Sequence, residues 1–180
     1  CADNAKKILA NALFLLILFS ICLTSFFMIF KDTLLMAFGA SEATLPFASD
    51  YLKIYLCGTI FVQLSIGLNP FITAQGKAKT AMVSMLIGAC LNIILDPIFI
   101  FALGLGVKGA ALATIISQAA SAVWILLFLT RKSTVLRFQK EFLKLDFSIV
   151  KKIASLGISP FIMQATESAI FIVFNSSLLI

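Results

Sequence analysis

Five long apolar segments restrict what this chain can fold into more than any other feature of its sequence. They occupy residues 8–30, 54–74, 80–102, 109–130 and 153–180, and each is long enough for a helix to cross the hydrocarbon core, which takes roughly 20 residues. Because hydrocarbon offers no partner to backbone N–H and C=O groups, such segments must be helices or strands of a closed barrel. Their apolar residues do not alternate with polar ones, as barrel strands require. The sequence therefore predicts an all-α, polytopic transmembrane helix bundle with five spans.

The composition excludes a water-soluble domain. Hydrophobic residues make up 61% and charged residues 12% of the 180, whereas soluble domains average roughly half apolar and about a quarter charged residues. The chain has no histidine, and its four cysteines show no CxxC spacing, so we expect no metal site, no cofactor and no catalytic residue. Because the chain opens on Cys1 and stops at Ile180 inside an apolar segment, we expect it to be a fragment.

The charged residues predict the orientation of the spans. If every span crosses, one side of the membrane holds eleven of the fourteen basic residues: Lys6, Lys7, Lys77, Lys79, Arg131, Lys132, Arg137, Lys140, Lys144, Lys151 and Lys152. The other side holds three lysines diluted by three acids: Lys31, Lys53, Lys108, Asp32, Glu42 and Asp50. The positive-inside rule places the first side in the cytoplasm, which predicts a multi-pass protein of the plasma membrane. The basic run is then an orientation signal and a contact to lipid headgroups, and no nucleic-acid partner is expected.

Residues 131–152 form the longest linker. They separate residues 1–130, with four spans, from residues 153–180, with the fifth. Apolar residues are interleaved with lysines in this linker, at Phe138, Phe142, Leu143, Leu145 and Phe147. This pattern predicts an amphipathic helix in the membrane interface. Two roles stay open for it, a tether between two helix bundles and a binding segment.

The segment NIILDPIFIF, residues 92–101, places an acid and a proline in the middle of an apolar run. Inserting a charged aspartate near the centre of a membrane helix costs about 2.5–3.5 kcal/mol of free energy. A purely structural role does not compensate for that cost. Asn92 lies four residues before Asp96 and therefore on the same helix face. Pro97 lacks an N–H and clashes with the carbonyl of Ile93, so we expect a hinge there.

The next span adds a hydroxyl and a packing face. A stripe of small residues recurs every four positions and lets another helix approach closely: Gly109, Ala113, Ser117 and Ser121. Thr114 lies beside this stripe. Counted from the short loop between the two spans, Thr114 and Asp96 sit at nearly the same depth. Asn92, Asp96 and Thr114 are therefore predicted to converge on one site for a proton or Na⁺. The alternative is a structural aspartate that is hydrogen-bonded within the bundle.

The fifth segment contains a second intramembrane acid. Glu167 lies fourteen residues past Ile153, roughly 21 Å deep and close to the midplane of the membrane. Gln164 and Ser168 flank its face, and Pro160 precedes it as a second candidate hinge. An acid at this depth in an apolar helix is a functional candidate. The alternative is a buried partner for a basic side chain.

Residues 67–118, GLNPFITAQGKAKTAMVSMLIGACLNIILDPIFIFALGLGVKGAALATIISQ, resemble the multidrug and toxic compound extrusion (MATE) family of efflux transporters. The matching pieces are Pro70 followed by QGKAK, then N-x-x-x-D-P, then G-V-x-G-A-A-x-A-T-x-I-S-Q. The resemblance implies a twelve-helix, two-lobe transporter, of which this chain holds the third to seventh helices and the inter-lobe linker. The missing helices would belong to the same full-length chain, in the inner membrane of a bacterium.

The same resemblance assigns roles to the polar residues. It implies a cation site made of Asn92, Asp96 and Thr114, with Glu167 as a further acid in the second lobe. The implied activity is antiport, in which H⁺ or Na⁺ enters as a drug-like, often cationic compound is expelled. The implied partners are the lipid bilayer and that organic substrate.

Other functions are weighed against antiport. A lipid-linked oligosaccharide flippase of the same superfamily would line its cavity with basic residues, and the five segments contain none. A passive channel needs rings of polar residues along a pore, whereas the polar residues here cluster. A non-transporting structural membrane protein needs no acid inside the membrane. An enzyme is not expected, because no nucleophile–base pair or metal set is visible.

Overall fold

Helices make up nearly all of the chain that the computed structural model describes, residues 2–131, 134–138 and 145–178. In chain order they are α1 (Ala2–Ala37), α2 (Leu45–Cys57), α3 (Thr59–Thr73), α4 (Ala78–Pro97), the π-helical turn η1 (Ile98–Ala102), α5 (Gly106–Thr130) and α6 (Phe147–Leu178). No strand occurs in these residues. The all-α helical bundle predicted from the apolar segments is confirmed.

Three helices are long and apolar enough to cross a membrane, namely α1, α4 continued by η1, and α5. α2 and α3 pass the same test only as a pair, which is bent by 56° around Gly58. The single helix predicted over 54–74 is therefore wrong: it is two helices, and Asp50 and Lys53 belong to the first of them. A Cβ on Gly58 would lie 2.4 Å from the side chain of Ile115, so the missing side chain lets the bend press against α5.

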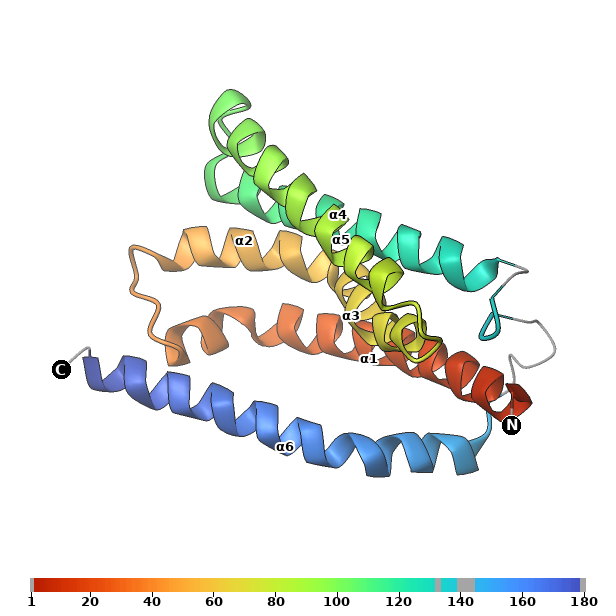
Figure 1. Cartoon of the computed structure of the whole chain (residues 1–180). Coiled ribbons are helices and arrows are strands. Elements are labelled where there is room, and N and C mark those ends of the chain that lie inside the picture. Colours follow the sequence, from red (N-terminus) through yellow and green to blue (C-terminus); the bar gives the residue numbers. More distant parts are fainter. Residues whose placement is uncertain (1, 132–133, 139–144, 179–180) are drawn as a thin grey trace.

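α6 contains the fifth predicted span, but within the described residues it is not among the helices long and apolar enough to cross a membrane. Gln164, Glu167 and the neighbouring hydroxyl residues lower the hydropathy of its middle. If the bent pair α2 and α3 counts as one span, the described residues support up to four spans. The sequence predicted five. Among the described elements α6 packs only against α1, and its residues 154–170 are exposed (Figure 1).

α5 is the centre of the bundle, since it packs against α2, α3, α4 and η1. The predicted small-residue stripe is buried on it, at Gly109, Ala113, Ser117 and Ser121. An added Cβ at Gly109 would lie 2.6 Å from the backbone oxygen of Phe99. Because glycine has no such atom, α5 can pack directly against the backbone of η1. The core cluster consists of Leu9, Leu64, Leu68, Ile72, Ala81, Ala122, Ile125 and Leu129.

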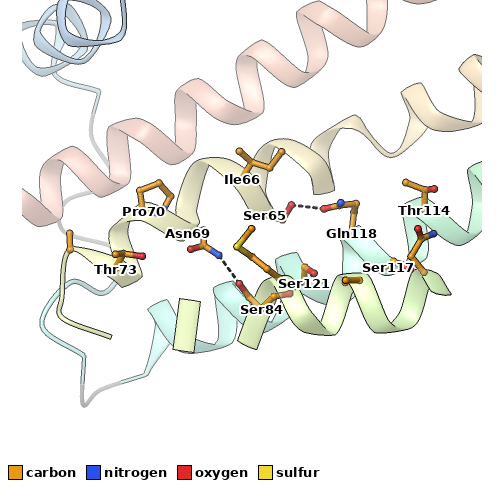
Figure 2. A pocket seen from close by; sticks show the side chains of 15 residues that line it. Ser65, Ile66, Asn69, Pro70, Thr73, Ser84, Thr114, Ser117, Gln118 and Ser121 are labelled. Atoms are coloured by element: carbon orange, nitrogen blue, oxygen red, sulfur yellow. Dashed lines mark hydrogen bonds between the residues drawn. The ribbon is translucent and has the colours of Figure 1, made fainter. Parts of the chain in front are cut away.

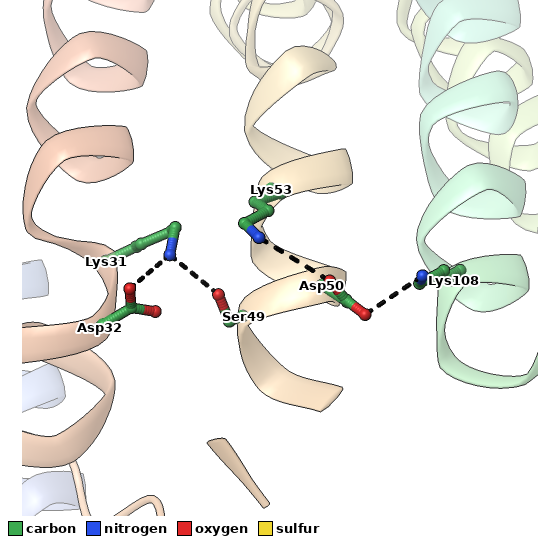
Figure 3. Close-up of polar contacts among 6 residues, drawn as sticks. All are labelled: Lys31, Asp32, Ser49, Asp50, Lys53 and Lys108. Atoms are coloured by element: carbon green, nitrogen blue, oxygen red, sulfur yellow. Dashed lines mark hydrogen bonds and ion pairs between the residues drawn. The ribbon is translucent and has the colours of Figure 1, made fainter. Parts of the chain in front are cut away.

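The two ends of the bundle differ in charge. The N-terminus, the turn between α3 and α4, the end of α5 and the start of α6 lie toward one end, here called the basic end (Figure 1). These segments carry the lysines and arginines that sequence analysis assigns to the cytoplasm. At the other end, lysines and acids form ion pairs: Lys31 with Asp32, and both Lys53 and Lys108 with Asp50 (Figure 3). These pairs offset positive charge at that end, and the Lys108–Asp50 pair joins α5 to α2.

The predicted amphipathic helix is not present in the described part of the linker. Residues 134–138 turn back without helical structure, while Phe142 and Leu143 lie outside the described residues. Leu136 and Phe138 pack against the core cluster. Phe138, the one of these two that belongs to the predicted helix, is thus partly buried against the bundle itself.

Candidate functional site

A groove with a mixed lining, mostly apolar in surface but studded with hydroxyl and amide side chains, runs between α3, α4 and α5, and its volume is about 930 Å³. Small and polar residues recur along each helix at intervals of three or four: Ser65, Asn69 and Thr73 on α3; Ser84, Gly88 and Asn92 on α4; Thr114, Ser117, Gln118 and Ser121 on α5. Residues so spaced share one helix face. The three faces meet because α3 and α4 both pack against α5.

Hydrogen bonds between these faces hold the helices together (Figure 2). Ser65 Oγ donates to Gln118 Oε1 at 2.7 Å, which joins α3 to α5. Asn69 Nδ2 donates to Ser84 Oγ at 2.7 Å and joins α3 to α4. Ser121 Oγ donates to the carbonyl of Ser84 at 2.8 Å and joins α4 to α5. Bonds of this kind stabilise membrane proteins by about 0.6 kcal/mol each on average.

One buried hydroxyl among the described groove residues has no hydrogen-bond partner. Ser117 is 2% exposed and lines the groove. Among the described residues its Oγ finds no hydrogen-bond partner. A buried polar group of this kind normally has one, so the unpartnered Ser117 hydroxyl is unusual.

The structure brings two of the three predicted cation-site residues into this groove. Asn92 lines it from α4 and Thr114 from α5. Asp96 is half-buried one turn beyond Asn92, outside the groove lining, and its Oδ1 accepts a hydrogen bond of 3.2 Å from Asn92 Nδ2. Thr114 Oγ1 donates to the carbonyl of Ala110 at 2.9 Å. The amide therefore contacts the acid, while the threonine hydroxyl keeps its lone pairs for another group.

The backbone changes its geometry directly after Pro97. α4 ends there, and the following residues form the π-helical turn η1, in which Leu103 N donates to the carbonyl of Ile98 at 2.9 Å. Such turns are rare and are frequently found at functional sites. Pro160, the other predicted hinge, lies inside α6, which continues through it.

Glu167 does not join the groove. It lies on the exposed part of α6 and accepts a hydrogen bond of 3.1 Å from Gln164 Nε2. The flanking Ser168 donates to the carbonyl of Gln164 within the same helix. No contact joins α6 to the three groove helices within the described part of the chain. The two intramembrane acids therefore occupy separate places.

The sequence patterns did not identify five polar residues of the groove: Ser65, Asn69, Thr73, Ser84 and Gln118. The spacing of polar residues by four on consecutive spans was a usable signal, but it does not say which faces meet. Within the described residues, no group of three or more His, Cys, Asp or Glu side chains could hold a metal ion.

Residues 2–98 match the family MatE. The chain belongs to this family. It is 38% identical over 146 residues to the multidrug export protein MepA of Staphylococcus haemolyticus (strain JCSC1435), covering 81% of this chain and 32% of that protein. It is 36% identical over 135 residues to MepA of Staphylococcus aureus (strain NCTC 8325 / PS 47), covering 75% of this chain and 30% of that protein. The chain thus spans about a third of the length of these curated relatives.

Solved structures of MATE transporters have the same fold over this portion. The inward-facing conformation of a multidrug resistance MATE family transporter matches with a TM-score of 0.82 and 28% identity, covering 87% of this chain and 36% of that one. An outward-facing conformation matches with a TM-score of 0.79 and 28% identity, covering 85% and 34%. The described helices therefore resemble both conformations almost equally.

Proposed function

We propose that this MATE chain is part of a cation-coupled antiporter that exports drug-like compounds across the plasma membrane. The proposal depends on one observation, the groove of α3, α4 and α5 with its apolar surface and interspersed polar side chains, which has the Asn92–Asp96 pair at one end. The groove supplies a place for an organic molecule. The acid supplies a group whose charge a cation can cancel.

Asp96 is the proposed binding group for H⁺ or Na⁺. A proton would sit on its carboxylate, and Na⁺ would take carboxylate oxygen together with the neutral oxygens of Asn92 and Thr114, the ligand type that hard cations prefer. Either cation removes the negative charge that Asn92 Nδ2 now contacts at 3.2 Å. Pro97 and the π-helical turn η1 come directly after Asp96 in the chain. A change in the charge of Asp96 therefore acts on the part of the helix with the least regular backbone. Glu167 is proposed as a second acid of the same kind on α6.

The groove suits a bulky organic compound with both apolar and polar parts. Its volume of about 930 Å³ lies within the range of small-molecule sites, about 300–1,000 Å³. Ile66, Pro70 and Met85 contribute apolar surface beside the hydroxyl and amide groups. Among the described residues, no lysine or arginine lines it, which disfavours the phosphate-linked substrate of a flippase.

The test uses the full-length protein in membrane vesicles loaded with a fluorescent cationic dye. Asp96→Asn keeps the size and the hydrogen-bonding oxygen of the side chain but removes its charge, so we expect loss of gradient-driven efflux with normal expression. Asp50→Asn, at the ion-paired end of the bundle, is the matched control and should transport dye. Efflux at the wild-type rate in Asp96→Asn would reject the coupling role. Separate pH and Na⁺ gradients identify the cation.

A further inference from the structure

Two serines one helical turn apart lie where α5 packs against α4. Ser121 Oγ donates to the carbonyl of Ser84 on α4 at 2.8 Å. Ser117, four residues earlier on α5, is 2% exposed, and its Oγ has no hydrogen-bond partner in the part of the chain that the structure describes. The two serines share one face of α5, yet only one of them is bonded to α4.

The register of the two helices gives Ser117 a matching acceptor. α4 runs away from the basic end and α5 returns toward it (Figure 1), so four residues forward on α4 correspond to four residues back on α5. The bonded pair Ser84 and Ser121 therefore has its counterpart in Gly88 and Ser117. These two residues are close, because a Cβ on Gly88 would lie 3.6 Å from the carbonyl oxygen of Ser117. A helical carbonyl has a second lone pair to offer, so the Gly88 carbonyl is an acceptor for Ser117.

Segments outside this chain cannot supply the partner while α4 and α5 keep this arrangement. The described helices already close off the Oγ atom of Ser117 from solvent. A new donor or acceptor needs about as much room beside that atom as a water molecule does, and further helices only add to its burial. The hydroxyl of Ser117 therefore gains a partner only when the contact between α4 and α5 changes or when its own side chain turns.

Serines and threonines inside helices commonly bond to their own backbone. Thr114 Oγ1 does so with the carbonyl of Ala110 at 2.9 Å. Ser117 does not, although the carbonyl of Ala113 lies one turn before it. Ser121, on the same face of α5, bonds across the contact to α4 instead. The precedent on this face is thus a bond between helices.

We propose that Ser117 is a positioning residue of a contact with two arrangements. In the arrangement described here its hydroxyl is unbonded. In the second, a small shift of α5 against α4 lets the hydroxyl donate to the carbonyl of Gly88, which adds one hydrogen bond between the helices. The bond of Ser121 persists in both arrangements.

The contact lies next to the proposed cation site. Asn92 follows Gly88 by one turn on the same face of α4, and its Nδ2 donates to Asp96 Oδ1 at 3.2 Å. A cation on Asp96 changes this hydrogen bond and with it the position of the α4 face that meets Ser117. Binding of the cation and closure of the contact are then coupled, since one helix face carries both. This coupling rests on the proposed function, because Asp96 must bind the cation.

The test is SDS unfolding of the full-length protein in mixed micelles, with Na⁺ titrated at fixed pH and pH titrated at fixed Na⁺. Because Ser117 is bonded in one arrangement only, we expect Ser117→Ala to shift the apparent affinity for the coupling cation roughly threefold, the effect of one interhelical hydrogen bond. Ser121→Ala is the matched control. It removes the same group one turn away, and its destabilisation should be equal at every cation concentration.

An unchanged cation affinity in Ser117→Ala would overturn the proposal and leave the serine to its own helix. Equal shifts in both variants would overturn it as well, because the two serines would then respond alike. Loss of folding in Ser117→Ala would show that the hydroxyl is already bonded in the resting protein, with the same consequence.

Dye efflux from vesicles containing the same proteins separates these failures from failure of the proposed function. If the wild type exports dye and responds to the cation while Ser117→Ala has the wild-type cation affinity, only the two-arrangement contact is lost. If the wild type shows neither efflux nor a cation response, the proposed function and the coupling both fail.

Discussion

Replacing Gly88 with alanine places a methyl group against a single hydroxyl where α4 crosses α5. The new Cβ would lie 2.5 Å from Ser121 Oγ, whereas the next neighbours, Ser117 O and Ser121 Cβ, lie at 3.6 and 3.7 Å. Ser121 is 4% exposed, and its Oγ donates to the carbonyl of Ser84 at 2.8 Å. The hydroxyl therefore cannot rotate away without losing that hydrogen bond. Removing the hydroxyl as well, in a Gly88→Ala/Ser121→Ala double variant, leaves the methyl group in ordinary contact.

Three effects set the free energies of unfolding. Alanine is favoured over glycine inside a helix by about 1 kcal/mol, and overpacking a buried contact costs about 1–3 kcal/mol. Ser121→Ala loses one interhelical hydrogen bond, about 0.6 kcal/mol. The helix preference acts equally in both backgrounds and cancels in the cycle. The coupling free energy is therefore the cost of relieving the clash, from about 0.6 kcal/mol if Ser121 rotates and gives up its hydrogen bond to about 1–3 kcal/mol if it stays in place.

The assay is reversible unfolding in mixed micelles with increasing SDS, followed by circular dichroism, for wild type, both single variants and the double variant. We expect Gly88→Ala to be less stable in the wild-type background than in the Ser121→Ala background. A coupling free energy below about 0.5 kcal/mol, the limit of ordinary additivity, would refute the contact. It would mean that α4 and α5 do not approach as closely as the structure places them.

Two further predictions concern Pro97 and the ion-paired end. Pro97→Ala restores a backbone donor at the junction of α4 and η1, so dye efflux should slow while equilibrium binding of the coupling cation is preserved; an equal loss of binding would contradict the hinge. Lys108→Gln removes an ion pair of 3.2 Å whose side chains are 56% and 39% exposed, so the free energy of unfolding should fall by less than about 1 kcal/mol. The difference should shrink further in high salt, and a salt-independent loss of several kcal/mol would show that the pair is shielded from solvent.

Local patterns predicted part of the site. The spacing of Asn92 and Asp96 by four residues placed both on one helix face, and the structure joins them by a hydrogen bond. Thr114 was expected beside them, and it faces the same groove as Asn92. Asp96 itself lies one turn outside that groove, because the depth of a residue does not specify the direction in which its helix face points. The coupling roles of these residues stay predictions until transport is measured.

Other features needed contacts between distant segments. The bend at Gly58 depends on the close approach of Ile115, and nothing in the apolar run 54–74 marks it except a glycine. The linker's apolar residues were interpreted as a membrane-interface helix, yet Phe138, one of them, is partly buried against the core of the bundle. Periodicity within a segment cannot distinguish burial in lipid from burial in protein, because both offer an apolar surface.

By itself the sequence determined the helical class and the family, since long apolar segments have few ways to satisfy their backbone in hydrocarbon and the motifs of residues 67–118 are local. Only the tertiary structure decided which polar faces meet, and so where the groove and the buried Ser117 hydroxyl lie. The physical reason is that helix formation is governed by hydrogen bonds four residues apart. The assembly of helices depends instead on close contacts between residues far apart in the chain, such as Gly88 and Ser121.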